Sequence, residues 1–448
     1  MSTSAVAIDA SAGAARRTDW LGHPAGLTIL FLTEMWEKFS YFGMRALLIY
    51  YMTKGLAIPQ ERASLIYGSY TAFAYFTPIV GGVIADRLLG RQRAVILGGS
   101  IMALGHFLMA FEHLFYPALV TIALGNGLFL PSLPSQVNAL YRPDDARRHS
   151  AFNVYYVGVN LGAVLAPLVC GTLGELLGWH WGFGAAGVGM CLGLAIYIMG
   201  SRYLPDTSLR AVERSAASSG ADDASFARRV LLLLAVIAIV VVFRGAYEQI
   251  GNTVALWIDG TVDRSISATA EIPSTWFQAL NPLLVFALTP LLLLVWTRRA
   301  RSGVTVAPLR RMACGALIVA AAFLLLATIA YLTTAANTTA PWPWLIAFFV
   351  IYTTGELLIL PTGLALFGRL APLRLAATAI AFWFSASFAG NLFAGALGSF
   401  WSAMSNASFF ALMAGVAASA AALLALLDRY TFTLLQDSPP PVTARNPP

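Results

Sequence analysis

Long apolar runs separated by short polar segments fill most of this sequence. Twelve of the runs are long enough to cross a bilayer as helices, for which about 20 residues are needed. A chain built in this way satisfies its backbone hydrogen bonds within each helix, as a membrane requires. The pattern therefore predicts an all-α membrane protein with twelve transmembrane helices, at residues 27–52, 63–86, 94–112, 116–141, 150–174, 182–203, 229–258, 273–297, 308–333, 343–368, 375–401 and 408–430.

The composition supports a membrane protein. Of the 448 residues, 58% are hydrophobic and only 11% are charged, and the mean hydropathy is +0.72. A soluble globular domain carries roughly 25% charged residues. The net charge of +7 would suggest a nucleic-acid partner in a soluble protein, but here most arginines lie in the even-numbered connections between spans. This asymmetry follows the positive-inside rule, so it predicts two cytoplasmic termini and no nucleic-acid partner.

One polar connection, at residues 204–227, is longer than the others and is rich in Ser, Ala, Asp and Arg. It divides the chain into an N-terminal half at 25–203 and a C-terminal half at 228–431, each with six predicted spans. The flanking residues 1–24 and 432–448 are polar and are expected to form disordered cytoplasmic tails. Two six-helix halves around a central cavity are the architecture of the major facilitator transporters.

The first predicted span carries charges that a lipid-facing helix would not tolerate. Each ionisable side chain at the bilayer centre costs roughly 2.5–3.5 kcal/mol on insertion scales. We expect Glu34 to pair with Lys38, and Glu37 to pair with Lys38 or with a partner on another helix. Such a face marks an ion or substrate pathway, whereas the alternative is a set of structural salt bridges. Helical spacing places on this one face Glu34, Glu37, Lys38, Tyr41, Phe42 and Arg45.

The same stretch, Glu34-x-x-Glu37-Lys38-Phe-Ser-Tyr-Phe-Gly43, resembles the ExxERFxYYG motif of the proton-coupled oligopeptide transporters, a family of the major facilitator superfamily. Further segments resemble landmarks of that family in the matching spans. They are Tyr75 to Pro78, Tyr155 to Asn160, Glu248-Gln249, Asn281-Pro282, Gly355-Glu356 and Trp383-Phe384. The loop from Gly81 to Arg93, which contains Asp86 and Arg87, resembles the signature loop of major facilitator transporters in general. The resemblance implies a monomeric twelve-helix symporter of the inner membrane that imports di- and tripeptides with protons by alternating access.

The resemblance also implies roles for individual side chains. A short peptide is a zwitterion, so Arg45 would bind its carboxylate and Glu356 its amino group. For the aromatic residues among the substrate-binding candidates below, simple packing is the alternative interpretation. For Asn160 and Asn281, the alternative is an interhelical hydrogen bond. The implied proton-coupling residues are Glu34, Glu37, Lys38 and Glu248. The implied substrate-binding residues are Tyr41, Phe42, Arg45, Tyr75, Asn160, Asn281, Glu356 and Trp383, and the implied gating residues are Asp86 and Arg87.

The sequence departs from the family pattern at three places. Lys38 replaces the motif arginine, which keeps the charge but loses the guanidinium fork. Leu130 stands where the family usually has a lysine in the fourth span, and the two extra helices that many bacterial members carry between the halves are absent. Arg244 lies one helical turn before Glu248, and we expect it to supply the cation that is missing at Leu130. The alternatives are that Arg244 extends to the membrane surface or only pairs with Glu248.

No motif for catalysis, nucleotide binding or metal binding is present. The three cysteines lie in apolar runs without metal-ligand spacing and are expected to be buried thiols, and His106 is expected to make a satisfied polar contact. We therefore expect no cofactor, no metal and no enzymatic activity. Within the same fold, a non-peptide substrate or export of a peptide-like metabolite is the main alternative. A peptide sensor that does not transport is a further one.

Overall fold

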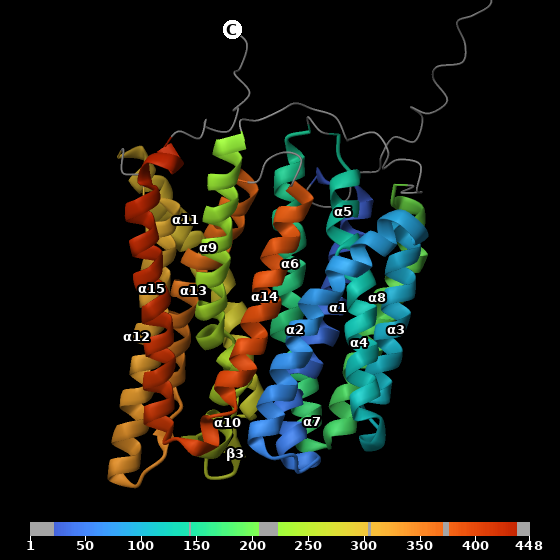
Figure 1. The fold of residues 1–448 in the computed structure, drawn as a ribbon. Coiled ribbons are helices and arrows are strands. Elements are labelled where there is room, and N and C mark those ends of the chain that lie inside the picture. Colours follow the sequence, from blue (N-terminus) through green and yellow to red (C-terminus); the bar gives the residue numbers. More distant parts are fainter. Residues whose placement is uncertain (1–21, 143–144, 206–222, 303–305, 371–375, 437–448) are drawn as a thin grey trace, which may run out of the picture. The chain divides into compact units, whose positions relative to one another are not determined.

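The structure, a computed structural model, describes residues 22–142, 145–205, 223–302, 306–370 and 376–436, and almost all of them are helical (Figure 1). The first helices are α1 (Ala25–Tyr50), α2 (Gln60–Ile84), α3 (Arg91–Leu108), α4 (Phe115–Phe129), α5 (Ser132–Ala139), α6 (Arg147–Ala166), α7 (Thr172–Leu176) and α8 (Trp179–Gly200). The later helices are α9 (Asp223–Tyr247), α10 (Thr253–Thr261), α11 (Leu280–Arg301), α12 (Pro308–Ala336), α13 (Pro343–Leu370), α14 (Ala376–Gly398) and α15 (Asn406–Gln436).

Four short strands complete the described chain. They are β1 (Val262–Asp263), β2 (Ser265–Ser267), β3 (Ala270–Glu271) and β4 (Ala340–Pro341). β1 pairs with β4 in parallel, and β2 pairs with β3 antiparallel. The strands lie in the connections that follow α10 and α12, so they join helix ends and do not form a core of their own.

Each of the twelve predicted spans coincides with a helical segment. Nine segments among the described residues are long and apolar enough to cross a membrane. The other three predicted spans fall on α1, α3 and α14, and α1 is the helix that contains the charged face. The twelve-helix prediction is consistent with these segments.

Three of the predicted spans are interrupted, which the apolar pattern did not reveal. The fourth breaks between α4 and α5 at Pro131, because proline lacks the N–H that a continuous helix needs. The fifth passes through a π-helical turn at Pro167–Gly171 before α7. The seventh passes through a 3₁₀ turn at Glu248–Gly251 between α9 and α10. Short 3₁₀ and π segments inside a helix often occur at functional sites, and Glu248 is one of the predicted site residues.

The chain forms two compact units. The first comprises Met1–Leu47 and Thr77–Ser215, and the second Leu48–Phe76 and Ala216–Pro448. Each unit has a core of its own, which contains Phe129 and Met190 in the first and Phe323 and Phe348 in the second. The predicted division into halves at 25–203 and 228–431 remains a prediction. Most of the predicted tails and linker lies outside the described residues.

Residues 48–76 belong to the second unit because of specific contacts. The Tyr50 hydroxyl donates to the Ala255 carbonyl at 3.1 Å, and Ser64 Oγ donates to Asn252 Oδ1 at 2.8 Å. Gly68 on α2 faces Gly395 on α14 so closely that a Cβ atom on Gly68 would collide with the Gly395 backbone. Small residues at such crossings let membrane helices approach one another.

The exposed surface is largely apolar along the helices. Cys170 is buried, but Cys191 and Cys314 are exposed, so the prediction of three buried thiols is wrong for two of them. An apolar run in a membrane protein has a lipid-facing side as well as a packed side, and both cysteines lie on the exposed side of their helices.

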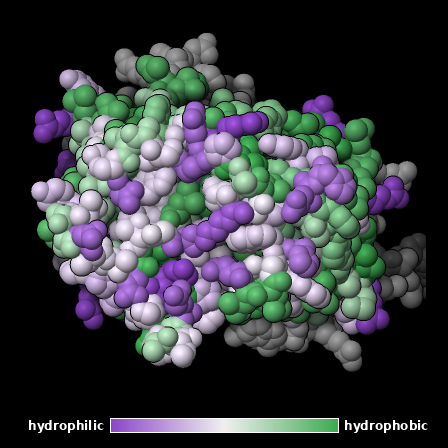
Figure 2. All heavy atoms as spheres, turned by 90° about the horizontal axis from the view of Figure 1, so that it is seen from below, coloured by the Kyte–Doolittle hydropathy of each residue, from purple (hydrophilic) through white to green (hydrophobic). Residues whose placement is uncertain are grey.

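Figure 2 views the end at which α10 and β3 lie in Figure 1, and hydrophilic side chains spread over much of this face. That composition suits contact with water beyond the bilayer.

Candidate functional site

A cluster of three charged side chains lies on α1 in the first unit. Lys38 Nζ is 2.6 Å from Glu37 Oε2 and 3.3 Å from Glu34 Oε1. Glu37 is 0% exposed and Glu34 is 2% exposed, so one ammonium group compensates two buried carboxylates. Pairing of Lys38 with both glutamates confirms the expectation from the helical spacing. Because a buried charge without a partner is strongly destabilising, each member of this cluster depends on the others.

Glycines of α6 pack this face of α1 closely. A Cβ atom on Gly162 would collide with the Met35 carbonyl and would lie against Lys38 Cβ. A Cβ atom on Gly158 would collide with Phe31 one turn earlier. The sequence Gly158-x-x-x-Gly162 thus acts as a small-residue packing motif, which brings α6 against the backbone of α1 beside the charged cluster.

Four further predicted residues of the first unit lie on α1 and α6. Tyr41 is buried, Phe42 and Arg45 are half-buried, and the rings of Tyr41 and Phe42 meet edge to face at 5.3 Å. Asn160 Nδ2 donates to the Tyr156 carbonyl one turn earlier at 3.0 Å. That bond stays within α6, so the alternative interpretation of Asn160 as an interhelical link gains no support from it.

The second unit holds a buried ion pair on α9 and the turn that follows it. Arg244 Nη1 donates to Glu248 Oε1 at 2.7 Å, and both residues are 5% exposed. The guanidinium carbon lies 5.6 Å from the centre of the Tyr75 ring, which is a cation–π distance. Gly390 on α14 leaves room for the Arg244 stem, since a Cβ atom at position 390 would clash with that stem. Arg244 is therefore held inside the unit, and the alternative that it extends to the membrane surface is wrong.

A hydrogen-bonded acid on α13 lies beside this pair. Glu356 Oε1 accepts from the Tyr247 hydroxyl at 2.8 Å, and Glu356 Oε2 accepts from Asn281 Nδ2 at 2.6 Å. Asn281 Nδ2 also donates to Thr353 Oγ1 at 3.0 Å. The Tyr247 ring stacks on Tyr352, with centroids 5.3 Å apart and 14° between the planes. Side chains from α9, α11 and α13 thus fix the orientation of the Glu356 carboxylate.

Tyr247 joins the two polar groups of the second unit. Its ring centre is 6.0 Å from the Arg244 guanidinium carbon, while its hydroxyl binds Glu356. The structure therefore brings four predicted residues and Arg244 into one polar network, which consists of Tyr75, Arg244, Glu248, Asn281 and Glu356. Sequence reasoning missed Tyr247, although a hydroxyl directly before a predicted acid was a usable signal.

Trp383 on α14 packs against α13. It is 8% exposed, its ring centre is 5.4 Å from that of Phe367, and Gly363 makes room for its indole. These contacts favour packing between α13 and α14 as the role of Trp383. A role of Trp383 in substrate binding stays a prediction, with packing as the alternative.

Three further predictions fall elsewhere in the first unit. Asp86 Oδ1 accepts from Arg91 Nε at 3.2 Å, as expected for a carboxylate that pairs with a nearby arginine, while Arg87 is exposed. His106 is 0% exposed, and neither of its ring nitrogens has a hydrogen-bond partner. The expected polar contact of His106 is therefore wrong. Within the described chain, no group of three or more His, Cys, Asp or Glu side chains is placed to hold a metal ion.

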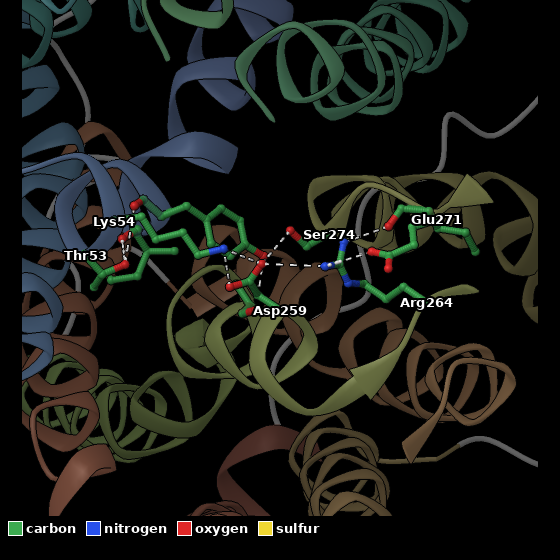
Figure 3. Close-up of polar contacts among 10 residues, drawn as sticks. Thr53, Lys54, Asp259, Arg264, Glu271 and Ser274 are labelled. Atoms are coloured by element: carbon green, nitrogen blue, oxygen red, sulfur yellow. Dashed lines mark hydrogen bonds and ion pairs between the residues drawn. The ribbon is translucent and has the colours of Figure 1, made fainter. Parts of the chain in front are cut away.

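A third charged cluster, which sequence reasoning missed, lies at the end of α10 (Figure 3). Lys54 Nζ is 2.6 Å from Asp259 Oδ2, and Arg264 Nη2 reaches Asp259 Oδ1 from the other side at 3.9 Å. Arg264 Nη2 also lies 3.6 Å from Glu271 Oε2, and Ser274 Oγ donates to Asp259 Oδ1 at 3.4 Å. Asp259 thus faces two cations. The available signal was a lone acid near the end of the seventh apolar run.

Comparisons with known proteins agree with one another. The model of the POT family matches residues 92–212 and 210–414. The peptide transporter YePEPT of Yersinia enterocolitica is 31% identical over 458 residues, which cover 85% of this chain and 88% of that protein. The di-/tripeptide transporter of Lactococcus lactis subsp. cremoris is 29% identical over 490 residues, which cover 93% of this chain and 98% of that protein.

Solved structures are similar over nearly the whole chain. A crystal structure of the peptide transporter POT with sulfate has a TM-score of 0.84 at 27% identity, covering 93% of this chain and 97% of that one. A mutant of that transporter with alafosfalin also has a TM-score of 0.84 at 27% identity, covering 94% and 98%. This likeness confirms the predicted all-α membrane fold.

Proposed function

This chain belongs to the POT family, and from that premise we propose that it imports di- and tripeptides together with protons. It is a multi-pass membrane transporter of the major facilitator fold and not an enzyme. We place it in the inner membrane with both termini in the cytoplasm, and a single chain is the working unit. The observation that carries the proposal is the buried carboxylate cluster around Lys38, because ionisable groups at membrane depth mark ion and substrate pathways.

For the substrate, Glu356 is the proposed partner of the peptide amino group. Each of its oxygens already accepts one hydrogen bond, from Tyr247 or from Asn281. A carboxylate has about four acceptor sites, so it keeps capacity for an ammonium group while the two protein donors hold it in place. Arg45 is the proposed partner of the peptide carboxylate, because a guanidinium fork matches a carboxylate in two parallel hydrogen bonds. The further proposed contacts of the peptide's side chains and backbone are Tyr41, Phe42, Tyr75, Asn160 and Trp383.

For the proton, Glu37 is the proposed carrier. Lys38 contacts Glu37 at 2.6 Å and Glu34 at 3.3 Å, so protonation of Glu37 leaves the ammonium with a second carboxylate. The cluster can therefore change its charge by one without leaving Lys38 unpaired. A lysine suits this exchange, since its ammonium is a point charge that can turn between two acceptors, unlike a rigid guanidinium fork.

Arg244 is the proposed replacement for the cation that is missing at Leu130. It supplies the positive charge of the network that contains Glu248 and Glu356. Protonation of Glu248 would release Arg244 from their 2.7 Å contact and make the guanidinium available to a peptide carboxylate. The remaining alternative is that Arg244 only pairs with Glu248. For gating, we propose Asp86 and Arg87, which lie in the turn between α2 and α3. Asp86 pairs there with Arg91.

The relatives' names favour peptides over the alternative of a different cargo or of export. The test is uptake of labelled dialanine by the purified protein in proteoliposomes, with and without an imposed pH gradient, acid outside. N-acetyl-dialanine, which lacks the amino group, is the matched control substrate. We expect accumulation of dialanine above equilibrium only with the gradient, and little uptake of the acetylated peptide.

Other outcomes point elsewhere. Exchange of dialanine without gradient-driven accumulation would keep the peptide site and remove proton coupling from the proposal. Absence of both binding and uptake of dialanine would overturn peptide transport and direct attention to Leu130 and to another cargo. Equal uptake of the acetylated peptide would remove the proposed role of Glu356.

A further inference from the structure

Basic side chains gather at one end of three helices of the second unit, away from the polar networks described above. The Arg311 guanidinium carbon lies 4.8 Å from the centre of the Trp296 ring, which joins the start of α12 to the end of α11. Arg310 Nη2 lies 3.1 Å from Asp428 Oδ2, which joins α12 to α15. Figure 1 shows α12 and α15 running alongside each other. The arginines of this basic end are Arg298, Arg299, Arg301, Arg310, Arg311 and Arg429.

Among the side chains that the structure describes at the basic end, negative charge is nearly absent. No acidic residue occurs between Trp296 and Met312, and the acid on the last turns of α15, Asp428, is 3% exposed and already bound by Arg310. Of the six arginines only Arg310 has a carboxylate of the described chain within ion-pair distance. All six side chains except that of Arg311 are exposed. The surface is thus charged to bind an anion.

An exposed apolar surface leads directly up to two of these arginines. Leu291 and Leu294 on α11 are 57% and 54% exposed. Arg298 and Arg301 follow at helical spacing i+7 and i+10 from Leu291, so the four side chains share one face of α11. No residue of α11 is buried. Trp296 lies on a different side of α11, where its ring contacts Arg311. The face therefore presents two leucines in the membrane span and then two guanidinium groups at its end.

We propose that this face binds an anionic phospholipid of the bilayer. Arg298 and Arg301 bind the phosphodiester headgroup, because guanidinium forks match phosphate oxygens in paired hydrogen bonds. The acyl chains lie along Leu291 and Leu294, so the order of apolar and charged positions on α11 repeats the order of chains and phosphate in the lipid. Basic clusters directly beyond a membrane helix attract anionic lipids in general. A zwitterionic lipid adds an ammonium group, which the surrounding arginines repel.

The test is native mass spectrometry of the full chain with phosphatidylglycerol and with phosphatidylcholine of the same acyl chains. Each basic residue at a membrane surface contributes roughly a fivefold change in affinity for anionic lipid. For the two arginines together we therefore expect the wild type to bind phosphatidylglycerol roughly 25-fold more tightly than phosphatidylcholine. The double variant Arg298→Gln/Arg301→Gln should lose most of this preference. The matched control, Arg93→Gln/Arg202→Gln, removes two exposed arginines from the first unit and should keep it.

Three results would overturn the proposal. The first is equal affinity of the wild type for the two lipids, which does not depend on any variant folding. The second is an equal loss of preference in the control variant, which would reduce the effect to overall charge. The third is displacement of phosphatidylglycerol by inorganic phosphate at an equal concentration, which would make the basic end a simple anion site. A further variant, Leu291→Ser/Leu294→Ser, keeps every charge. It should weaken the binding of long-chain phosphatidylglycerol but not the binding of dihexanoyl phosphatidylglycerol.

Discussion

The Tyr247 hydroxyl donates a 2.8 Å hydrogen bond to Glu356 Oε1, and this contact links α9 to α13 inside the second unit. Tyr247 is the last residue of α9, directly before the 3₁₀ turn that carries Glu248. A rearrangement of that turn would therefore move both the partner of Arg244 and a partner of Glu356. One tyrosine thus couples the proposed amine site to the buried ion pair.

We expect Tyr247→Phe to weaken peptide binding through Glu356. Removal of the hydroxyl leaves the carboxylate with only the donor from Asn281 in the described chain, so its orientation is less fixed. A hydrogen bond to a charged group contributes about 1.5–3 kcal/mol, which corresponds to roughly a tenfold or larger rise in the KM for dialanine. The measurement is the concentration dependence of uptake into proteoliposomes.

Tyr352→Phe is the matched control for this prediction. The Tyr352 hydroxyl donates to the Tyr247 backbone carbonyl at 2.5 Å, so its loss removes a hydrogen bond of the same stack without touching the Glu356 carboxylate. Equal KM values for Tyr247→Phe and the wild type would show that Glu356 does not need Tyr247. An equal rise in both variants would assign the effect to the aromatic stack.

We expect Glu37→Gln to separate exchange from accumulation. Glutamine keeps the shape of the fully buried side chain but cannot take up and release a proton. Lys38 would still have Glu34 at 3.3 Å, so the cluster should stay folded. Counterflow exchange of dialanine should persist, whereas accumulation driven by a pH gradient should fall at least tenfold. Gradient-driven accumulation at the wild-type level in Glu37→Gln would remove this residue as the proton carrier.

Sequence reasoning found the parts of the molecule that depend on local spacing. The charges on α1 recur at helical intervals, and the cost of burying them requires a pairing such as Lys38 makes with Glu34 and Glu37. The positions of the spans follow from the length of apolar runs. The breaks after Phe129 and Tyr247 were missed because apolar residues resume beyond each of them, although Pro131 and the polar pair Glu248-Gln249 mark the two positions.

Contacts between segments that are distant in the chain could not be predicted from the sequence. Lys54 and Asp259 are 205 positions apart, and nothing in either neighbourhood identifies the other as its partner. His106 was expected to be satisfied, since most buried polar groups are hydrogen-bonded, yet both of its ring nitrogens lack a partner. The packing of Trp383 on Phe367 likewise depends on how α13 and α14 meet, which a single sequence does not specify.

Arg244 and Glu248 should show strong coupling in a double-mutant cycle. Both are 5% exposed, so loss of one partner leaves the other charge buried and is expected to cost about 3–5 kcal/mol. The double variant Arg244→Gln/Glu248→Gln removes both charges and should be less destabilised than either single variant. Thermal unfolding in detergent gives the stabilities, and uptake as a function of pH gives the function. If Arg244→Gln transports dialanine with an unchanged pH profile, Arg244 is not the replacement cation.

The Asp145–Arg147 pair should not contribute to the pH dependence of transport. Hydrogen bonds from the side chain and backbone of Arg147 lower the pKa of Asp145 from its ordinary 3.8 to about 2. Its contribution to stability is therefore present above pH 3.8 and is lost only as the pH falls toward 2. Between pH 5 and 8 the carboxylate stays ionised, so Asp145→Asn should shift uptake equally at every pH. A changed pH profile in this variant would show that Asp145 titrates in that range.

The two cations around Asp259 should substitute for each other in part. Lys54 lies 2.6 Å from Asp259 Oδ2, and Arg264 lies 3.9 Å from Oδ1, so loss of Lys54 leaves the carboxylate with a nearby guanidinium. The Lys54 side chain is 51% exposed, and an ion pair of this kind contributes about 0–1 kcal/mol. We therefore expect small falls in the unfolding midpoint for Lys54→Gln and for Arg264→Gln.

The double variant Lys54→Gln/Arg264→Gln should fall by more than the sum of the two single variants, because only then does Asp259, with 13% of its side chain exposed, lose both cations. Residues that share one partner commonly couple by about 0.5–3 kcal/mol. Glu271→Gln is the control, since Glu271 contacts Arg264 at 3.6 Å but is 68% exposed and should contribute little. Strictly additive losses would mean that the 3.9 Å contact carries no energy and that Lys54 alone compensates Asp259.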